Sequence, residues 1–359
     1  MELEPFLLIF TSSSAWRRPK AIKNILIGRR TVSNLYWALQ YNMLDFFGAL
    51  HGIDLPDSIP SVAHMRRSGV LQVDENQMVR RTQQGDDKRA FFLSEVPDMN
   101  DLKWASRFEV GSFMTRFTFL VQVVSEYSYG NAHYYPQTVS FIDRQIVKRF
   151  FLANKSTEFP KAVYQLLNDF LGGLHNDNFA EIMVSNFSGH RVAGRTDQQM
   201  ANQLGQPIGQ IQLINLLLSA QLLAFLVKGA SKQVTPLLQG LSKPVISASA
   251  LTTFQLFLKD PTLSYQQIAS RRHIKLTTVY EHLLEAAIVL PVADVPFTRL
   301  LAPATEQQLD AIAPDQVGNW AYQSLSKRLP DISFFDFRLF QIKRARVSAA
   351  TGREDGQNG

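Results

Sequence analysis

The sequence has no cysteine in its 359 residues. Disulfides, thiolate metal sites and a cysteine nucleophile are therefore excluded, and the composition fits a reducing compartment, so we expect a cytoplasmic protein. The patterns GxxxxGK(S/T), HExxH, GxSxG and that of the EF-hand are also missing, and the seven histidines lack the spacing of metal ligands. We expect a non-catalytic protein with no catalytic residue, no metal, no cofactor and no evident small-molecule substrate.

Long apolar runs are scarce. The longest, residues 214–227, contains Asn215 and Gln221 and is too short to cross a bilayer, so it predicts a buried helix. The N-terminal run Phe6–Phe10 follows an acidic start and is too short for a signal peptide. We therefore expect no membrane segment.

The composition favours a folded protein of several domains. Hydrophobic residues make up 45% of the chain and 25 residues are phenylalanine, which is enough apolar surface for a large core. A chain of this length usually forms two or three domains. The net charge of +6 and the pI near 9.4 permit nucleic-acid binding without requiring it.

Residues 251–290 hold the most informative pattern. Apolar residues at helical spacing predict a helix over 251–258, which the following Asp-Pro pair ends. Ser264 precedes Gln267 by three residues, which is the pattern of a capping box at the start of a second helix. A third helix is predicted over 276–287. Two helices joined by a tight turn are typical of a helix-turn-helix.

The turn and the polar face of this pattern can be placed on residues. His273 occupies the turn position, where glycine is usual. In the third helix the apolar stripe includes Leu283, and we expect Thr278, Glu281 and Glu285 on the opposite, exposed face. The pattern therefore predicts a recognition helix with acids on its exposed face.

The C-terminal part of the chain also resembles a known domain. The residues that carry the resemblance are Phe257, Leu263-Ser264, Ile268-Ala269, Arg272, Thr278-Val279, His282-Leu283 and the stretch Leu325–Phe337. From about Thr252 to Val347 the sequence looks like the helicase helix-turn-helix domain at the C-terminus of some RecQ-type helicases. With Gly28–Thr31 and Phe150–Leu152, the whole chain is similar to the stand-alone YpbB-like proteins of low-GC Gram-positive bacteria, encoded beside a RecQ-type helicase gene. The resemblance implies DNA and a RecQ-type helicase as partners.

A helix-turn-helix places the start of its second helix nearest to the bases. Here that start is Lys275–Thr278, with two arginines just before it. The predicted phosphate contacts are Arg271, Arg272 and Lys275. The predicted base-edge contacts are Thr277, Thr278 and Glu281.

Two further basic segments are candidates for a secondary patch. The first segment lies between Trp16 and Thr31 and contains six bases and no acid. The second lies near the end of the last predicted helix. The candidate residues are Arg17, Arg18, Lys20, Lys343, Arg344 and Arg346. The alternative for the first segment is a solvated helix face or loop.

A second helix-turn-helix-like pattern precedes the first by 68 positions. Thr196 and Gln199 form another capping-box pattern, and the shift aligns Gly205 with His273. Glycine suits the left-handed conformation of such a turn. Because the following helix is strongly apolar, the alternative is that this copy is structural and binds nothing.

The patterns together predict a mainly α-helical, multi-domain protein with helix-turn-helix modules. Residues 69–81 alternate in polarity around turn-forming residues and predict one small β-hairpin, with a surface loop as the alternative to a wing. The predicted domains are a helical N-terminal domain at 1–185 with a winged-helix-like part at 20–85, a helix-turn-helix-like segment at 186–230, a linker at 231–250, a helicase helix-turn-helix domain at 251–347 and a disordered tail at 348–359. We expect the C-terminal module to fold on its own.

Three functions remain open. The resemblance favours a non-catalytic DNA-binding accessory protein that acts with a RecQ-type helicase in DNA repair or recombination. The second is a protein-interaction adaptor that contacts the helicase and no DNA. The third is a helix-turn-helix transcriptional regulator, which would bind a palindromic operator as a dimer. Charge does not choose among them, since residues 251–347 carry 11 Lys/Arg against 9 Asp/Glu.

Overall fold

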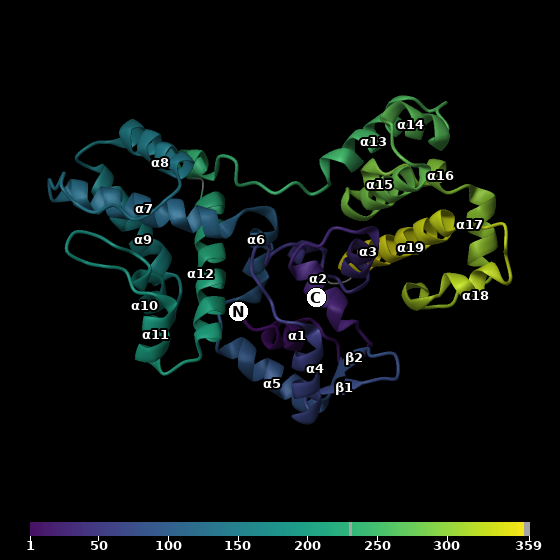
Figure 1. Cartoon of the computed structure of the whole chain (residues 1–359), viewed down its shortest axis with the longest axis horizontal. Coiled ribbons are helices and arrows are strands. Elements are labelled where there is room, and N and C mark those ends of the chain that lie inside the picture. Colours follow the sequence, from purple (N-terminus) through teal and green to yellow (C-terminus); the bar gives the residue numbers. More distant parts are fainter. Residues whose placement is uncertain (230–231, 355–359) are drawn as a thin grey trace. The chain divides into compact units, whose positions relative to one another are not determined.

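The computed structural model describes residues 1–229 and 232–354 of the chain (Figure 1). Those residues form nineteen α-helices, five short 3-10 helices and one two-stranded antiparallel sheet. The predicted mainly α-helical fold with one small hairpin is confirmed. The last helix, α19 (Phe334–Glu354), extends into the range predicted as a tail. Residues 355–359 of that range, residue 230 of the predicted helix-turn-helix-like segment and residue 231 of the predicted linker lie outside the described residues.

The chain divides into two compact units. The first comprises residues 1–23 and 48–243, and the second comprises residues 24–47 and 244–359. The predicted C-terminal module therefore shares its unit with a segment near the N-terminus, residues 24–47. No sequence pattern connected these two parts of the chain.

The first unit is built around α12 (Ile208–Lys228). Its side chains at Leu217, Leu218 and Leu222 are fully buried. It contacts α6 (Lys103–Arg107), α7 (Val110–Ser128), α10 (Asp177–Ser185) and α11 (Asp197–Leu204). Within the described residues α12 is the one helix long and apolar enough to cross a membrane, but 61% of its most hydrophobic window is buried inside the protein. We therefore assign α12 to the core, as the sequence predicted.

The other helices of this unit are α1 (Glu4–Phe10), α4 (Ser58–Arg67), α5 (Gln83–Ser94), η2 (Met99–Leu102), α6 (Lys103–Arg107), α7 (Val110–Ser128), α8 (Phe141–Asn154), α9 (Phe159–Gly172), α10 (Asp177–Ser185), α11 (Asp197–Leu204) and η3 (Lys232–Leu238). The residues of α2 (Pro19–Leu26) are divided between the two units.

A β-hairpin lies between α4 and α5. Its strands β1 (Leu71–Val73) and β2 (Val79–Arg81) pair antiparallel. The Oδ1 atom of Asp74 accepts two backbone N–H groups of the turn, at 2.9 and 2.8 Å, and so fixes its shape. Arg17 pairs with β2 in one isolated bridge. The hairpin predicted at residues 69–81 is confirmed.

The second unit surrounds α15 (Leu276–Val289), whose Val279 and Leu283 are fully buried. In Figure 1 the purple α3 (Val32–Gln40), from the N-terminal part of the chain, lies beside the yellow α19, and both contact α15. Leu35 and Tyr36 of α3 are each 1% exposed and belong to the same apolar core as α15. The other elements of this unit are α3 (Val32–Gln40), η1 (Leu44–Phe46), α13 (Ala248–Lys259), α14 (Tyr265–Arg272), η4 (Val292–Asp294), α16 (Phe297–Leu300), α17 (Pro303–Asp310), η5 (Val317–Asn319), α18 (Tyr322–Ser326) and α19.

Tyr36 holds α3 in this unit by polar contacts as well. Its hydroxyl donates a hydrogen bond to the carbonyl oxygen of Gly318 at 2.9 Å, and the guanidinium of Arg338 lies 3.7 Å from the centre of its ring. Burial raises the pKa of Tyr36 to about 12. The hydroxyl therefore stays protonated and remains a donor throughout the physiological pH range.

Candidate nucleic-acid interface

The two helices α14 and α15 are joined by a tight turn at His273. The predicted capping box is present at the start of α14, where the backbone N–H of Ser264 donates to Oε1 of Gln267 at 2.8 Å and the N–H of Gln267 donates to Oγ of Ser264 at 3.2 Å. α14 ends at His273, whose backbone is left-handed with φ 51° and ψ 43°. A residue with a side chain thus takes the conformation that glycine adopts most easily. The predicted turn position is confirmed.

Only the first turns of α15 face solvent. Thr277 and Glu281 are exposed and Thr278 is half-buried, whereas every residue from Leu283 to Ile288 is buried. The buried half is covered by α3, α13 and α19. The exposed half is the end that a helix-turn-helix presents to the major groove.

Two predicted phosphate contacts lie on the exposed side of the turn. Lys275 is exposed and precedes α15 in an extended conformation. Arg271 keeps 56% of its side chain exposed, and its Nη1 lies 3.8 Å from Oδ2 of Asp260, which is a loose surface ion pair. The pKa of Asp260 is lowered chiefly by hydrogen bonds from Thr262, with Arg271 a smaller cause. Both cations can therefore turn toward a phosphate without breaking a buried contact.

Arg272 lies in a different environment from Arg271. Its Nη1 donates to the carbonyl oxygen of Ser249 and to Oγ1 of Thr253, both at 2.9 Å, and its Nη2 donates to Oγ of Ser249 at 3.2 Å. Thr253 is also hydrogen-bonded to Nδ1 of His282 at 2.8 Å. Arg272 thereby links α14 through α13 to α15. The phosphate contact predicted for Arg272 would require it to leave these partners.

The prediction that Glu285 lies on an exposed face was wrong. Its residue exposure is 7%, and its Oε1 accepts Nη1 of Arg30 at 2.6 Å and the backbone N–H of Ser247 at 2.7 Å. The periodicity argument placed Glu285 opposite the apolar stripe of α15, but α15 is covered on that side too. Glu281 is thus the only exposed acid within α15 among the described residues.

Comparison with known families agrees with this geometry. Residues 249–341, from α13 into α19, match a family described as a helix-turn-helix domain. The second unit contains a helix-turn-helix domain. No curated protein matches the chain, and no solved structure matches it. The match covers the C-terminal part of the chain, so it bears on this domain alone.

The three bases of the predicted secondary patch on α19 are all paired within the helix-turn-helix domain. Lys343 and Arg344 form ion pairs with acids of α17, at 2.5 and 3.1 Å. Nη1 of Arg346 donates to the carbonyl oxygens of Ala287 and Ile288, at 2.8 and 2.9 Å, and so satisfies acceptors in the last turn of α15. Burial lowers the pKa of Arg346. These contacts give the three residues a structural role in the domain.

The other three bases of that patch belong to the first unit. The Nη1 of Arg17 donates to the carbonyl oxygen of Phe10 at 2.6 Å, while Arg18 and Lys20 are exposed near the start of α2. Arg17, Arg18 and Lys20 are therefore not part of the helix-turn-helix domain.

The second predicted helix–turn–helix pair is also present, as α11 and α12. Both capping-box hydrogen bonds of Thr196 and Gln199 are formed, at 2.9 and 3.2 Å. Gly205 ends α11 in the left-handed conformation, with φ 63° and ψ 27°. The start of α12 carries Ile208 and Gln210 and no base, and most of the helix is buried. These features support the structural alternative for this copy.

Sequence reasoning missed the contribution of residues 24–47 to the domain. Arg30 and Tyr36 make hydrogen bonds to residues more than 200 positions away. The apolar run after Leu283 was a usable signal, because a helix that is apolar all round is buried all round and needs more partners than α13 and α14 supply.

Proposed function

We propose that this protein is a non-catalytic DNA-binding accessory protein that acts with a RecQ-type DNA helicase in DNA repair or recombination. The observation that carries the DNA-binding part is the exposed start of α15 beside two cations, Arg271 and Lys275, that are free to move. The family match supports it, since the matched range contains this surface. The chain itself would supply binding and positioning rather than chemistry.

The geometry suggests how duplex DNA would be held. Arg271 and Lys275 would contact phosphates and set the register, and Thr277 and Thr278 would reach base edges from the first turn of α15. Glu281 lies one turn further along, where its carboxylate can accept a hydrogen bond from cytosine N4 but repels phosphate. The buried second half of α15 fixes the orientation of the exposed half. Binding of moderate affinity with a clear salt dependence is the expected result.

The helicase partnership rests on the resemblance of residues 252–347 to the C-terminal domain of RecQ-type helicases. It is tested by unwinding of a forked duplex by a purified RecQ-type helicase, with and without this protein. We expect the rate or extent of unwinding to change only on mixing, and we expect no ATP hydrolysis by this protein alone. No change in unwinding and no association on mixing would remove the helicase from the proposal.

DNA binding is tested by titration against duplex, forked and single-stranded DNA at several salt concentrations. The double variant R271E/K275E should weaken binding to all sequences alike and lower the log–log salt slope by roughly 0.9 for each lost phosphate contact. The matched control is K327E/R328E, because both side chains are exposed in the same unit and have no partner within the described residues. Equal slopes for R271E/K275E and the unmodified protein would contradict this mode of binding.

An adaptor that binds the helicase and no DNA is the second candidate. It is favoured by the small number of movable cations, since Arg272, Lys343 and Arg346 are committed to contacts within the domain. The adaptor function would be favoured if the protein binds no DNA and its association with the helicase survives nuclease treatment. A transcriptional regulator would instead be a dimer with one preferred palindromic site.

A further inference from the structure

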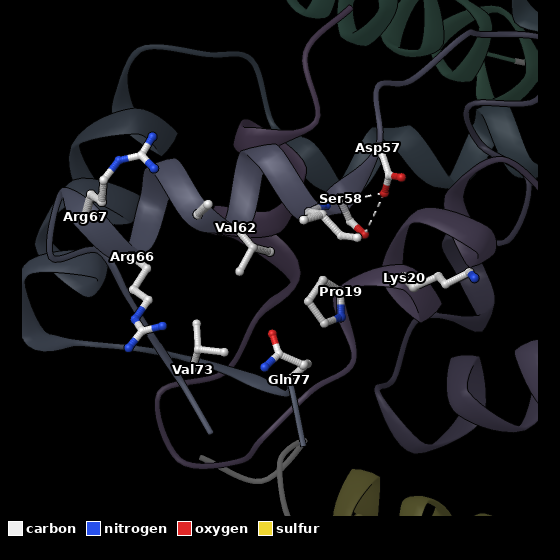
Figure 2. A pocket seen from close by; sticks show the side chains of 11 residues that line it. Pro19, Lys20, Asp57, Ser58, Val62, Arg66, Arg67, Val73 and Gln77 are labelled. Carbon is white, nitrogen blue, oxygen red and sulfur yellow. Dashed lines mark hydrogen bonds between the residues drawn. The ribbon is translucent and has the colours of Figure 1, made fainter. Parts of the chain in front are cut away.

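An open pocket of about 700 Å³ lies in the first unit, between α4, the start of α2 and the β-hairpin (Figure 2). Its lining is mostly apolar. Ile59, Val62 and Ala63 come from α4, Pro19 comes from α2, and Val73 ends β1. Neither the helix-turn-helix domain nor the proposed DNA contact involves any of these residues.

The outward face of α4 explains the apolar lining. Ile59, Val62, Ala63 and Arg66 follow the spacing of one helix face, while Met65 points into the core and is 2% exposed. Ile59 is 73% exposed. A helix of this kind has an apolar stripe that the fold does not cover, and apolar surface gathered in a concave site favours a ligand with apolar groups.

Charge is distributed unevenly around the pocket. Figure 2 shows Arg66 and Arg67 on one side and Lys20 with Asp57 on the other. Both arginines are exposed, and neither side chain has a hydrogen-bond or ion-pair partner among the residues that the structure describes. The Oδ1 atom of Asp57 accepts the backbone N–H of Ile59 at 3.3 Å, and this hydrogen bond is the main cause of the lowered pKa of Asp57. Asp57 is therefore ionised and offsets Lys20, which leaves the arginine side as the positive end.

We propose that this pocket binds a short peptide segment of a partner protein, in which bulky apolar side chains lie next to carboxylates. The apolar side chains would enter between Val62, Ala63 and Val73, and the carboxylates would face Arg66 and Arg67, whose planar guanidinium groups can hold a carboxylate with two hydrogen bonds. Gln77 on the hairpin adds a polar group at the wall, which can bond a peptide backbone. The hairpin predicted as a wing would thus serve as one side of a peptide site.

The same features argue against a nucleic acid as the ligand. A phosphate backbone is held by cations spaced along a track, and it gains nothing from an apolar floor. Asp57 is ionised inside the lining and would repel phosphates. An acidic and apolar peptide uses both the floor and the arginine side, so the charge and the lining point to the same class of ligand.

The test starts from a displayed library of random peptides of about twelve residues, selected on the full-length protein. We expect the enriched peptides to combine aromatic or long aliphatic residues with Asp or Glu. Binding of the enriched peptides, measured by fluorescence anisotropy, should fall by roughly tenfold or more in R66E/R67E, where attraction becomes repulsion. It should fall similarly in Ala63→Trp, which fills the pocket without changing charge.

The matched control is R144E/K148E on α8, where both side chains are exposed in the same unit and lack partners within the described part of the chain. It should bind the peptides like the unmodified protein, and thermal unfolding should show that all variants are folded. The proposal is overturned if no peptide is enriched, if the enriched peptides show no acidic bias, or if R66E/R67E and Ala63→Trp bind them unchanged. Loss of duplex DNA binding in R66E/R67E without any peptide binding would assign the surface to nucleic acid instead.

Discussion

Arg30 and Glu285 lie 255 positions apart in the sequence and form an ion pair in which Nη1 and Oε1 are 2.6 Å apart. Glu285 also accepts hydrogen bonds from the backbone N–H and the hydroxyl of Ser247, the residue that caps α13. The guanidinium of Arg30 donates in addition to the carbonyl oxygen of Val245, at 3.1 and 3.2 Å. One buried carboxylate of α15 therefore joins the N-terminal segment to the start of the helix-turn-helix domain.

Removing Arg30 should destabilise the second unit. Arg30→Ala leaves the carboxylate of Glu285 buried without its cation, and we expect a loss of about 2–3 kcal/mol in the free energy of unfolding. This is below the range for a fully buried pair, because 28% of the Arg30 side chain is exposed. Urea denaturation of Arg30→Ala, Glu285→Ala and the double variant measures the coupling between the two residues. Additive effects of the single changes would show that the ion pair contributes nothing.

The ion pair between Arg30 and Glu285 was not predicted from the sequence, whereas several local features were. The capping boxes at Ser264 and Thr196, the turn at His273 and the hairpin were predictable because each is built from residues within a few positions of one another. The environment of Glu285 was not, because Arg30 and Ser247, from other parts of the chain, contact the carboxylate that helical periodicity assigned to solvent. A side chain's exposure depends on packing from elsewhere in the chain, and the roles of Arg272 and Arg346 were missed for the same reason.

A C-terminal fragment that lacks residues 24–47 should be unstable, which replaces the expectation from the sequence that the C-terminal module folds on its own. The C-terminal fragment 244–347 would lose Leu35 and Tyr36 from its apolar core and the partner of Glu285. We expect it to unfold with low cooperativity and to bind hydrophobic dyes, and we expect a fusion of 24–47 to 244–347 to restore a sharp thermal transition. In the full chain, Leu35→Ala should cost about 2–4 kcal/mol as a large-to-small change in the core. Cooperative unfolding of the isolated fragment would show instead that the domain folds without α3.

His282 should make the stability of the second unit depend on pH. Burial lowers its pKa below the ordinary value of 6.5, so the unfolded chain binds the proton more tightly than the folded chain does. The contribution of the neutral imidazole to the free energy of unfolding is fully present above about pH 6.5. It is lost as the pH falls through the lower pKa that His282 has in the folded state. The stability difference between the unmodified protein and His282→Gln should therefore shrink between pH 7.5 and pH 5. A difference that stays constant over this window would mean that His282 does not titrate differently in the folded state.

The two adjacent arginines of α14 should behave differently on substitution. Arg272→Ala removes three hydrogen bonds to α13 and leaves a buried hydroxyl at Thr253 with one partner fewer, so we expect a loss of about 1–3 kcal/mol. Arg271→Ala removes only a loose surface pair and should change stability by less than about 0.5 kcal/mol. Arg271→Ala should instead weaken DNA binding. Chemical denaturation and DNA titration of the same two variants separate the structural arginine from the exposed one, and equal stability effects would contradict the assignment.

The two left-handed turns that end α11 and α14 allow the strain of each backbone to be measured separately. A methyl group added at Gly205 would meet no atom within 4 Å, so Gly205→Ala tests backbone conformation alone and should destabilise the first unit by about 1 kcal/mol. His273→Gly should do the opposite in the second unit. It relieves about 1–2 kcal/mol of left-handed strain and loses roughly 0.5–1 kcal/mol to the greater freedom of glycine in the unfolded chain, which leaves a small net stabilisation.

The control for this pair is Gly111, which lies in α7 with helical backbone and no atom within 4 Å of an added Cβ. Gly111→Ala should stabilise the protein by roughly 0.5–1 kcal/mol, since alanine is the better helix former. The sign of a Gly→Ala change would then follow from the backbone conformation, because Gly205 and Gly111 are both sterically open. If Gly205→Ala and Gly111→Ala shift the free energy of unfolding in the same direction, the left-handed turn of α11 is not strained for residues with a side chain. The stabilisation expected for His273→Gly would then lose its physical basis, because the left-handed conformation of His273 would carry no strain for glycine to relieve.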